Sequence, residues 1–337
     1  MAKKKDIAQE TITARNAKRD LITDKKRVNS LADKVEQLQK EMEAMLALSR
    51  NVVKGSFKHI EASDDTEAVA VVLASDWHIE EPVKRQSVNG LNEYNLEIAE
   101  KRIHEFFVNV TKLLKKEQEN ARIDTLILWL GGDFISNNIH DVLLETNQLT
   151  PIEAILQAQE WIERGIHYLL ENTSVNLIIP TSAGNHSRIT VKVHVNTEYG
   201  NSLETYMYHM IAKHVENHRV QFVIDEAYFT YLDVYGLTLC FHHGHALRYQ
   251  GGVGGLYVPT RRALSQWNKK RRVDIWCMGH FHSYLQDSSF LCNGSLIGWN
   301  AYADRLSVDF EPPKQTFFLI DKKRKCRTVT IPIMFSV

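Results

Sequence analysis

Five short segments of the sequence gather the residue types that bind divalent metal ions. They are Ser75-Asp76-Trp77-His78, Gly131-Gly132-Asp133, Gly184-Asn185-His186, His242-His243-Gly244-His245 and Gly279-His280-Phe281-His282. Their side chains offer imidazole nitrogens together with carboxylate and amide oxygens, and none of the segments contains a cysteine. Such a ligand set suits manganese, iron, zinc or nickel better than a structural zinc site rich in thiolates.

Each segment comes after an apolar run with the composition of a buried strand. The runs cover residues 68–74, 125–130, 175–179, 238–241 and 273–278. Sites in α/β folds form outside the carboxyl ends of strands, so five strands would bring Asp, Asn and His side chains to one edge. Side chains at i and i+2 point the same way on leaving a strand. Asp76 and His78 can therefore reach one ion together, and His280 and His282 can approach the same site.

Helical patterns at residues 95–119 and 151–171 separate the first three runs. Strand–helix–strand alternation favours an α/β domain with partly parallel strands. The tail, from about residue 288 on, adds strand-like runs at 315–320 and 328–333 and has few helical signals. We therefore expect residues 68–337 to form the domain that carries the site.

The first fifty residues are polar, contain neither Gly nor Pro, and have a heptad pattern. Apolar residues recur at Leu21, Val28, Leu31, Val35, Leu38, Met42 and Met45, with alternating steps of three and four from Val28 onward. This pattern predicts an N-terminal helical or coiled-coil segment at 1–50, which would form a homo-oligomer through residues 21–48. The alternative is an amphipathic helix packed on its own domain. Residues 51–67 are expected to be a linker.

The composition is that of an ordinary globular protein, because 44% of the 337 residues are hydrophobic and 24% are charged. The longest purely apolar run, residues 68–74, is too short for a membrane-spanning helix, so no membrane partner is expected. No apolar stretch of a secretory signal follows the charged start. The four cysteines show no CxxC spacing, which favours free thiols and a cytoplasmic location.

The formal net charge is zero, but one stretch is strongly basic. Residues 246–272 hold seven basic residues and no acidic one, with Tyr249, Tyr257 and Trp267 interleaved and a glycine-rich run at 251–255. Basic side chains follow phosphates and aromatic rings stack on bases, so the stretch favours a nucleic-acid substrate. The alternative is a solvated helix face with its tyrosines in the core. The candidate substrate-binding residues are Arg248, Arg261 and Arg262.

The order of the segments, D-x-H, G-D, G-N-H, H-G and G-H-x-H, resembles the calcineurin-like metallophosphoesterases over roughly residues 68–300. The resemblance implies a four-layer β-sandwich of two mixed sheets flanked by helices, with a two-metal site at one edge. It also implies a role for each residue. Asp76, His78 and His282 would hold the first ion, Asn185, His243 and His280 the second, Asp133 would bridge the two, and His186 would face the leaving-group oxygen without binding metal.

Two-metal chemistry would follow from that arrangement. Ions roughly 3.5–4 Å apart clamp a phosphoryl group, and a bridging water loses its proton readily to become the nucleophile. His186 would act as general acid or transition-state donor. Asp133 must be a carboxylate, because a neutral amide bridges two cations poorly. The resemblance implies two divalent ions, with Mn²⁺ expected first and Fe, Zn or Ni as alternatives.

Two features depart from the family pattern. The family often has Asp or Glu after G-N-H, where this chain has Ser187, which leaves open what supports His186. In the fourth segment three imidazoles compete for one ligand position. The family context favours His243, His245 is the second choice, and His242 is expected to point away.

Within the family, the chain looks most like the Mre11/SbcD-related exonucleases and the DNA repair exonuclease-like proteins of bacteriophages. This implies DNA as the substrate and the host cytoplasm as the location if a phage encodes the chain. It also implies a separate ATPase partner, because the sequence contains no Walker motif. His140 and His194 are candidates for the wall of the substrate cleft. The alternatives are a phosphatase for monoesters of proteins or nucleotides, and a coiled-coil scaffold with a non-catalytic phosphoesterase domain.

Overall fold

The computed structural model describes residues 25–26, 29, 32–37, 39–40, 66–249, 254–305 and 309–336. The chain divides into two units, Met1–Ser56 and Phe57–Val337. The described residues of the first unit are helical and exposed, with an ion pair of 2.8 Å between Lys40 and Glu36. Of the seven heptad positions only Val35 is described, and it is 53% exposed. The rest of the predicted coiled coil lies outside the described residues and stays a prediction.

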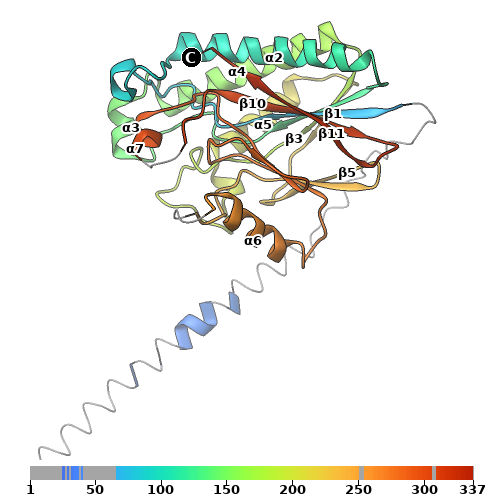
Figure 1. Ribbon diagram of the computed structural model, residues 1–337. Coiled ribbons are helices and arrows are strands. Elements are labelled where there is room, and N and C mark those ends of the chain that lie inside the picture. Colours follow the sequence, from blue (N-terminus) through green and yellow to red (C-terminus); the bar gives the residue numbers. More distant parts are fainter. Residues whose placement is uncertain are drawn as a thin grey trace, which may run out of the picture. The chain divides into compact units, whose positions relative to one another are not determined.

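Two mixed β-sheets form the frame of the second unit (Figure 1). The first has the strand order β11-β10-β1-β2-β3-β4 and the second the order β5-β6-β7-β9-β8. Strands β1 to β4 pair in parallel, and β10 pairs antiparallel with both β1 and β11. In the second sheet β6, β7 and β9 pair in parallel, with β5 and β8 antiparallel at the edges.

The first sheet consists of β1 (Ala68–Ala74), β2 (Thr125–Leu130), β3 (Asn176–Pro180), β4 (Val220–Val223), β10 (Lys314–Asp321) and β11 (Cys326–Met334). The second consists of β5 (Thr230–Val234), β6 (Leu237–Phe241), β7 (Ile275–Met278), β8 (Leu285–Gln286) and β9 (Phe290–Cys292). The five strands expected to precede the metal-binding segments are β1, β2, β3, β6 and β7, and their bounds agree with the expected runs to within two residues.

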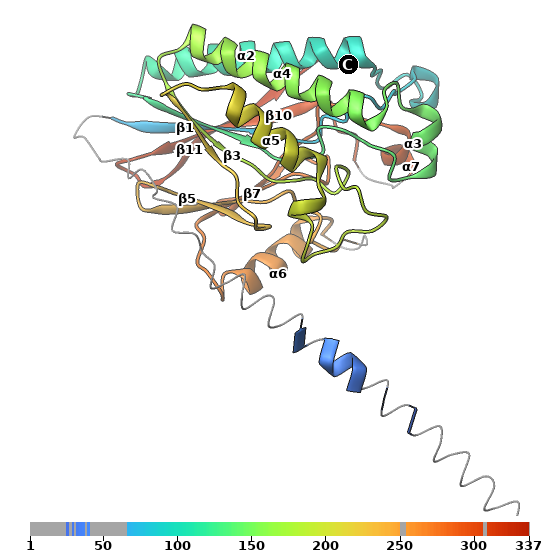
Figure 2. The ribbon, with the colours of Figure 1, turned by 180° about the vertical axis from the view of Figure 1, so that it is seen from behind.

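Helices cover the outer face of each sheet. Those on the first sheet are α2 (Leu96–Gln118), α4 (Pro151–Asn172) and α5 (Leu203–His214), seen from behind in Figure 2, while α6 (Tyr257–Trp267) packs on the second. Shorter helices are η1 (Arg85–Val88), α3 (Asp141–Thr146), η2 (Tyr199–Asn201) and α7 (Ala301–Arg305). The expected α/β fold of two mixed sheets flanked by helices is confirmed.

The sequence of β1 explains why this strand lies between helices and a second sheet. Successive side chains of a strand point to opposite faces. Ala70 and Val72 belong to the core shared with the helices, whereas Val71 and Leu73 belong to the core between the two sheets. All residues of β1 are buried, as expected for a strand covered on both faces. The end of β1 is thereby fixed, and the first metal-binding segment begins there.

The helices before β2 and β3 begin where the sequence provides capping residues. The side chain of Asn95 accepts a hydrogen bond from the N–H of Ile98 at the start of α2. Thr150 and Glu153 form a reciprocal capping box at the start of α4. Such caps satisfy N–H groups that have no partner within the helix. The two helices expected at 95–119 and 151–171 are thereby confirmed.

The start of the domain is tied to the sheet by a residue that the sequence assigned to the linker. Glu67 is buried and forms a β-bridge with Arg122. Residues 51–65 of the predicted linker lie outside the described residues. Among the helices in the described parts of the chain, none has the length and apolar character needed to cross a bilayer.

Candidate metal centre

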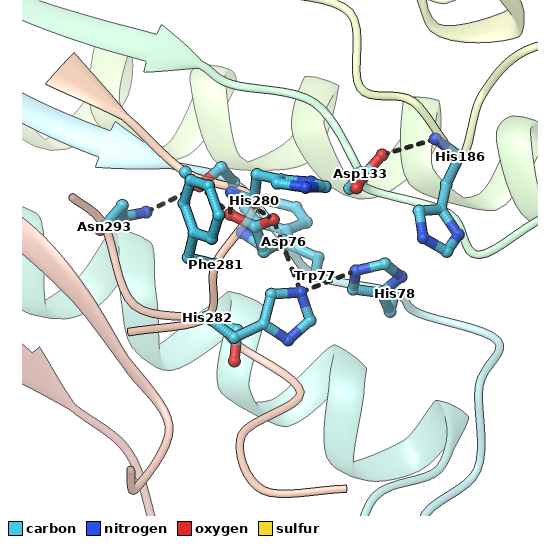
Figure 3. A network of polar contacts seen from close by, with 12 residues as sticks. Asp76, Trp77, His78, Asp133, His186, His280, Phe281, His282 and Asn293 are labelled. Carbon is cyan, nitrogen blue, oxygen red and sulfur yellow. Dashed lines mark hydrogen bonds and ion pairs between the residues drawn. The ribbon is translucent and has the colours of Figure 1, made fainter. Parts of the chain in front are cut away.

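The segments that the sequence marks as metal-binding converge at one edge of the two sheets. Figure 3 labels residues of four of them, those that contain Asp76, Asp133, His186 and His280. They follow β1, β2 and β3, which are neighbours in the first sheet, and β6 and β7, which are neighbours in the second. Hydrogen bonds join the loops of the two sheets. The N–H of His280 donates to Oδ1 of Asp76 at 3.0 Å, and Nδ1 of His243 lies 2.7 Å from the carbonyl oxygen of Gly131. The sandwich thus brings both sets of side chains to one place.

Asp76, His78 and His282 form the first group of candidate ligands, with one ligand atom of each within 4.8 Å of the others. The Nε2 atoms of His78 and His282 are 3.1 Å apart, and Nε2 of His282 lies 3.6 Å from Oδ1 of Asp76. Figure 3 shows these side chains pointing toward one another. Two imidazole nitrogens and a carboxylate oxygen in this arrangement can coordinate one ion.

Asp133, His243 and His280 form the second group, again with ligand atoms within 4.8 Å of one another. Nε2 of His243 lies 2.9 Å from Oδ2 of Asp133. Asn185 belongs to the loop that lies against Asp133, because the N–H of the next residue, His186, donates to Oδ1 of Asp133 at 2.8 Å. The structure therefore brings six of the seven predicted ligands together in two groups, and it places the loop of Asn185 and His186 against the second group.

Two buried polar atoms, one in the second group and one on the neighbouring Asn185, lack a partner in the protein and could contact a metal ion. Oδ1 of Asn185 and Nδ1 of His280 are buried and have no hydrogen-bond partner among the described residues. Buried polar atoms nearly always have a partner, and a divalent cation would be one for both. The donor set of imidazole, carboxylate and amide oxygen suits Mn, Fe, Zn or Ni. The residues thus fit a pair of divalent ions, whose identity the donor set alone does not select.

Two histidines are held by their second ring nitrogen in the orientation that ligands need. A carbonyl oxygen only accepts hydrogen bonds, so Nδ1 of His243, beside the carbonyl of Gly131, carries a proton. Nδ1 of His78 lies 2.8 Å from Oγ of Ser136. In both residues Nε2 is the atom that faces the site, as is typical of metal-binding histidines with a fixed ring.

The charges of the second group favour a cation between its members. Burial alone would raise the pKa of Asp133, but the charges of His243 and His186 hold it well below its ordinary value. Burial acts to lower the pKa of His243, and the charge of Asp133 outweighs it and raises this pKa to about 10. The carboxylate thus stabilises a positive charge on His243. A bound metal ion would take the place of that proton.

The other three candidate histidine ligands are kept neutral. Burial is the largest cause that lowers the pKa of His78, His280 and His282, in the last case to about 4. Neighbouring imidazoles lower each of them further. Neutral imidazole is the form that binds metal ions, so these rings do not have to lose a proton at neutral pH.

Five candidate ligands adopt a left-handed backbone conformation, which is uncommon for residues other than glycine. Their φ angles are 58° at Asp76, 48° at His78, 52° at Asp133, 72° at His280 and 51° at His282. Each such residue costs of order 1–3 kcal/mol and persists only where the surrounding structure enforces it. The loops after β1, β2 and β7 therefore hold strained conformations that aim side chains into the site.

Two glycines let the loops approach the carboxylates. A Cβ atom on Gly184 would lie 2.0 Å from Oδ1 of Asp133, and a Cβ atom on Gly279 would lie 2.4 Å from Oδ2 of Asp76. No other residue type fits these positions without displacing a candidate ligand. The glycines of the G-N-H and G-H-x-H segments are thus required by the packing of the site.

His186 lies beside both groups and keeps one ring nitrogen free. Its Nδ1 lies 2.9 Å from the carbonyl oxygen of Ser136, so Nδ1 carries the proton of that hydrogen bond. Its ring meets that of His78 edge to face, with centroids 4.9 Å apart (Figure 3). Nε2 is therefore the atom available to a reacting group.

Ser187, which stands where the resembling family often has Asp or Glu, stabilises the loop after β3. Ser187 is buried, and its hydroxyl contacts the carbonyl oxygen of Gly184 at 3.0 Å and Oγ of Ser202 at 2.7 Å. It thus stabilises the loop and does not contact the ring of His186. The carbonyl of Ser136 supports that ring in place of a carboxylate.

The three imidazoles of the fourth segment have separate environments. Only His243 belongs to a candidate ligand group. His245 directs Nε2 to a carboxylate oxygen of Glu198, 2.7 Å away, and its ring lies 5.5 Å from that of His243. His242 is buried among aromatic rings that include Tyr228 and Trp267. The choice of His243 over His245 agrees with this geometry, and His242 does point away.

Sequence reasoning missed four residues that support the site, the buried Glu80, Ser136 and Glu204 and the half-buried Glu81. Glu80 accepts hydrogen bonds of 2.8 Å from the N–H groups of Ser136 and Asn137. Oγ of Ser136 donates to Glu81 at 2.9 Å. In the sequence, the one available signal is that Glu80 and Glu81 follow the D-x-H segment within three residues.

Glu204 joins the two loops that carry Asp133 and Asn185. Its carboxylate, on α5, accepts hydrogen bonds from the N–H of Phe134 at 2.7 Å and from the N–H of Gly184 at 2.8 Å. Burial raises its pKa to about 7, and the charge of Asp133 adds to this rise. No local motif marks Glu204, because its partners lie on distant loops.

The basic stretch forms α6 and the segments around it, on the outer layer of the second sheet (Figure 1). Arg261 pairs with Asp287 at 3.2 Å, and Trp267 packs against other aromatic rings. Arg248 and Arg262 are exposed. The solvated helix face that the sequence left open as an alternative thus describes part of the stretch, and Trp267 is not free to stack on a base.

The two histidines expected near the cleft differ. The ring of His140 lies 6.0 Å from that of His186. His194 is exposed, and no contact between it and the site is found among the described residues. Only His140 therefore lies next to the site.

No family model matches the chain, and no curated protein matches it either. Solved structures of similar fold include Vps29 of Entamoeba histolytica complexed with zinc, at 11% identity and a TM-score of 0.31, covering 78% of this chain and 99% of that one. A predicted phosphoesterase of Streptococcus pneumoniae has 12% identity and a TM-score of 0.29, covering 77% of this chain and 86% of that one.

A putative 5′-nucleotidase of Staphylococcus aureus in complex with α-ketoglutarate has 9% identity and a TM-score of 0.35. The match covers 80% of this chain and 55% of that one. Identities and scores this low describe a likeness of fold alone and carry no information about function. The function has to be inferred from the site itself.

Proposed function

We propose that the chain is a metal-dependent phosphoesterase that hydrolyses phosphodiester bonds, with DNA as its substrate. The observation that carries this proposal is the presence of two adjacent groups of ligands with a free histidine beside them. The N–H of His280, in the second group, donates to Oδ1 of Asp76, in the first, at 3.0 Å, so the two groups are adjacent. Burial raises the pKa of Asp76 to about 7, and the charges of His243 and Asp133 act on it in opposite directions. Adjacent sites of this kind are used in two-metal phosphoryl transfer.

Each residue then has a defined part. Asp76, His78 and His282 would hold one ion, Asn185, His243 and His280 the other, and Asp133 would contact both. When bound, the two ions would supply Lewis-acid stabilisation of the phosphoryl group. The protein fixes the ligand atoms through the ring contacts of His78 and His243 with Ser136 and Gly131.

His186 would handle the proton of the leaving group. Its Nδ1 is engaged by the carbonyl of Ser136, so the ring cannot rotate freely. A proton on Nε2 can then be donated to the leaving oxygen of the ester. General acid catalysis of this kind contributes typically ~10²–10⁴-fold to the rate.

The exposed basic residues favour a polyanionic diester over a small monoester. Arg248, Arg262, Lys269, Lys270 and Arg272 are exposed, and the segment that contains them carries no acidic residue between 246 and 272. Positive surface of this kind attracts the phosphates of nucleic acids and steers their association. A phosphatase for monoesters has no need of it.

The test is hydrolysis of three substrates by Mn²⁺-loaded protein. They are bis-p-nitrophenyl phosphate, p-nitrophenyl phosphate and end-labelled DNA, both single- and double-stranded. We expect turnover of the diester and cleavage of DNA, both lost in His186→Ala. His209→Ala serves as the matched control, because His209 lies on the exposed side of α5 and contacts Tyr199.

Exclusive hydrolysis of p-nitrophenyl phosphate would contradict the proposed diesterase and favour a phosphomonoesterase. Equal rates for wild type and His186→Ala would contradict the role of the histidine. Absence of any hydrolysis by protein that contains both ions would contradict a catalytic function altogether.

A further inference from the structure

Arg188, two residues after His186, is built into the edge of the candidate site. The side-chain amide of Asn137 donates to the carbonyl oxygens of both His186 and Arg188, at 2.9 and 3.0 Å. The N–H of Ile189 donates to the carbonyl oxygen of Asn201 at 2.9 Å. The backbone that carries Arg188 is thus held on both sides, so the position of its side chain is defined by the fold.

The guanidinium of Arg188 has only part of its hydrogen-bonding capacity satisfied by the described residues. Nη1 donates to the carbonyl oxygen of Asn185 at 2.5 Å, and this is its single side-chain hydrogen bond among the described residues. Nε is buried and has no partner there. An arginine side chain offers five N–H donors, and a buried donor without a hydrogen-bond partner is destabilising. Nη2 makes no hydrogen bond among the described residues and is the donor that remains for an anion from outside the chain.

The imidazole of His140 adds a second hydrogen-bonding group at the same place. Its ring lies 6.0 Å from that of His186, and its side chain is exposed. Asn137 holds the backbone of both His186 and Arg188, so the three residues belong to one corner of the site. Burial and the charges of His186 and Arg188 lower the pKa of His140, and the charge of Asp141 acts in the opposite direction. His140 forms no ion pair among the described residues, and the acidic group whose charge acts on it is that of Asp141, its neighbour in the chain.

The charges of Asp133 and Glu198 act on Arg188, but each carboxylate already has a histidine partner. Asp133 is paired with His243 at 2.9 Å and Glu198 with His245 at 2.7 Å.

We propose that Arg188 and His140 form an anion subsite that binds the phosphate next to the scissile phosphodiester of a nucleotide chain. The inference rests on the proposed phosphodiesterase function and adds the substrate class. Because His140 lies against His186, which faces the leaving group in the proposed mechanism, the subsite recognises a phosphate carried by the leaving-group side. A planar guanidinium and an imidazole are both suited to bind phosphate oxygens.

The test compares three dinucleotides with Mn²⁺-loaded protein, thymidylyl-thymidine without a terminal phosphate and the same diester with a 5′ or a 3′ terminal phosphate. We expect wild type to prefer one of the phosphorylated forms by at least about tenfold in kcat/KM, the size of one charge-assisted interaction. Arg188→Gln and His140→Gln should each bring this ratio toward one. Lys192→Gln, which removes a charge from an exposed position of the same loop, should leave the ratio unchanged.

Equal rates on the three dinucleotides, or a preference that survives in both variants, would overturn the subsite while leaving the diesterase intact. Hydrolysis of bis-p-nitrophenyl phosphate by wild type separates this result from a failure of the proposed function. Should Arg188→Gln not fold, because it loses its bond to the carbonyl of Asn185, His140→Gln decides the question. The side chain of His140 is exposed and makes no hydrogen bond among the described residues.

Discussion

The backbone N–H of His186 donates a hydrogen bond of 2.8 Å to Oδ1 of Asp133. The same carboxylate directs Oδ2 to Nε2 of His243, 2.9 Å away. The candidate bridging ligand therefore also fixes the loop that presents the candidate general acid. In the proposed mechanism, metal binding and proton donation would therefore both depend on this one side chain.

Removal of the His186 imidazole should separate chemistry from metal binding. In His186→Ala the backbone N–H still donates to Asp133, so the ligands stay in place. We expect the rate on a diester to fall by ~10²–10⁴-fold while the metal content stays that of wild type. Steady-state kinetics and elemental analysis of the same preparation measure both. A loss of metal that parallels the loss of rate would mean that His186 is a ligand instead.

The hydroxyl of Ser136 should matter for the first ion. In Ser136→Ala, His78 loses the partner of its Nδ1 and Glu81 loses a donor, whereas the carbonyl that supports His186 remains. Loss of such a supporting contact costs typically ~10–100-fold in metal affinity or activity. Titration with Mn²⁺ measures the affinity, with Ser87→Ala, an exposed serine, as control. Unchanged affinity and rate would show that the ring of His78 needs no such support.

A single methyl group on Gly184 should disrupt the centre. The added Cβ would lie 2.0 Å from Oδ1 of Asp133, so Gly184→Ala must displace the carboxylate or the loop. Overpacking of this kind costs typically ~1–3 kcal/mol, and metal binding should be lost with it. Gly200→Ala is the control, since no atom lies within 4 Å of its Cβ position. Thermal unfolding and Mn²⁺ titration report on both variants. Wild-type metal affinity in Gly184→Ala would show that the loop has room.

Glu80 should make stability depend on pH. Burial raises the pKa of Glu80 from 4.5 to about 7, although three backbone N–H groups, its own and those of Asn137 and Ser136, favour the charged form. Between these values the folded state keeps the proton that the unfolded state releases. The free energy of unfolding therefore falls as the pH rises through this window, by up to ~3 kcal/mol.

Glu80→Gln cannot titrate and should remove that part of the pH dependence. Urea unfolding of metal-free protein at pH 4.5 and pH 8 measures it, and the change between the two pH values should be smaller in the variant. Glu97→Gln, on the first turn of α2, is a suitable control. An identical pH dependence in wild type and Glu80→Gln would contradict the raised pKa.

The sequence predicted the parts of the fold whose signal is local. The run AVAVVLA is long, β-branched and covered on both faces, so β1 has the predicted bounds. Asn95 and Thr150 mark their helices through caps. Short elements gave no such signal: β4 has four residues, none of them fully buried, and α5 contains the buried Glu204 among its apolar positions.

The residues of the site also divide into those that a local sequence signal marks and those that only the fold reveals. Its ligands occur as pairs or singles directly after strands, so their types and spacing mark them. Ser136 and Glu204 act through hydrogen bonds to residues that are distant in sequence, such as His78 and Gly184. Only the folded chain brings these partners together. Arg188 belongs to the same category, because its unpartnered Nε is a property of its surroundings.

The most direct test of the account is the metal content of the purified protein after loading with Mn²⁺. Elemental analysis should find about two ions per chain in wild type, as expected for a two-metal site. Asp133→Asn, which keeps the shape of the bridging side chain and removes its charge, should lose metal and turnover together. Asp309→Asn, at an exposed position, should retain both ions. Wild-type protein without bound metal, or two ions retained in Asp133→Asn, would contradict the central claim.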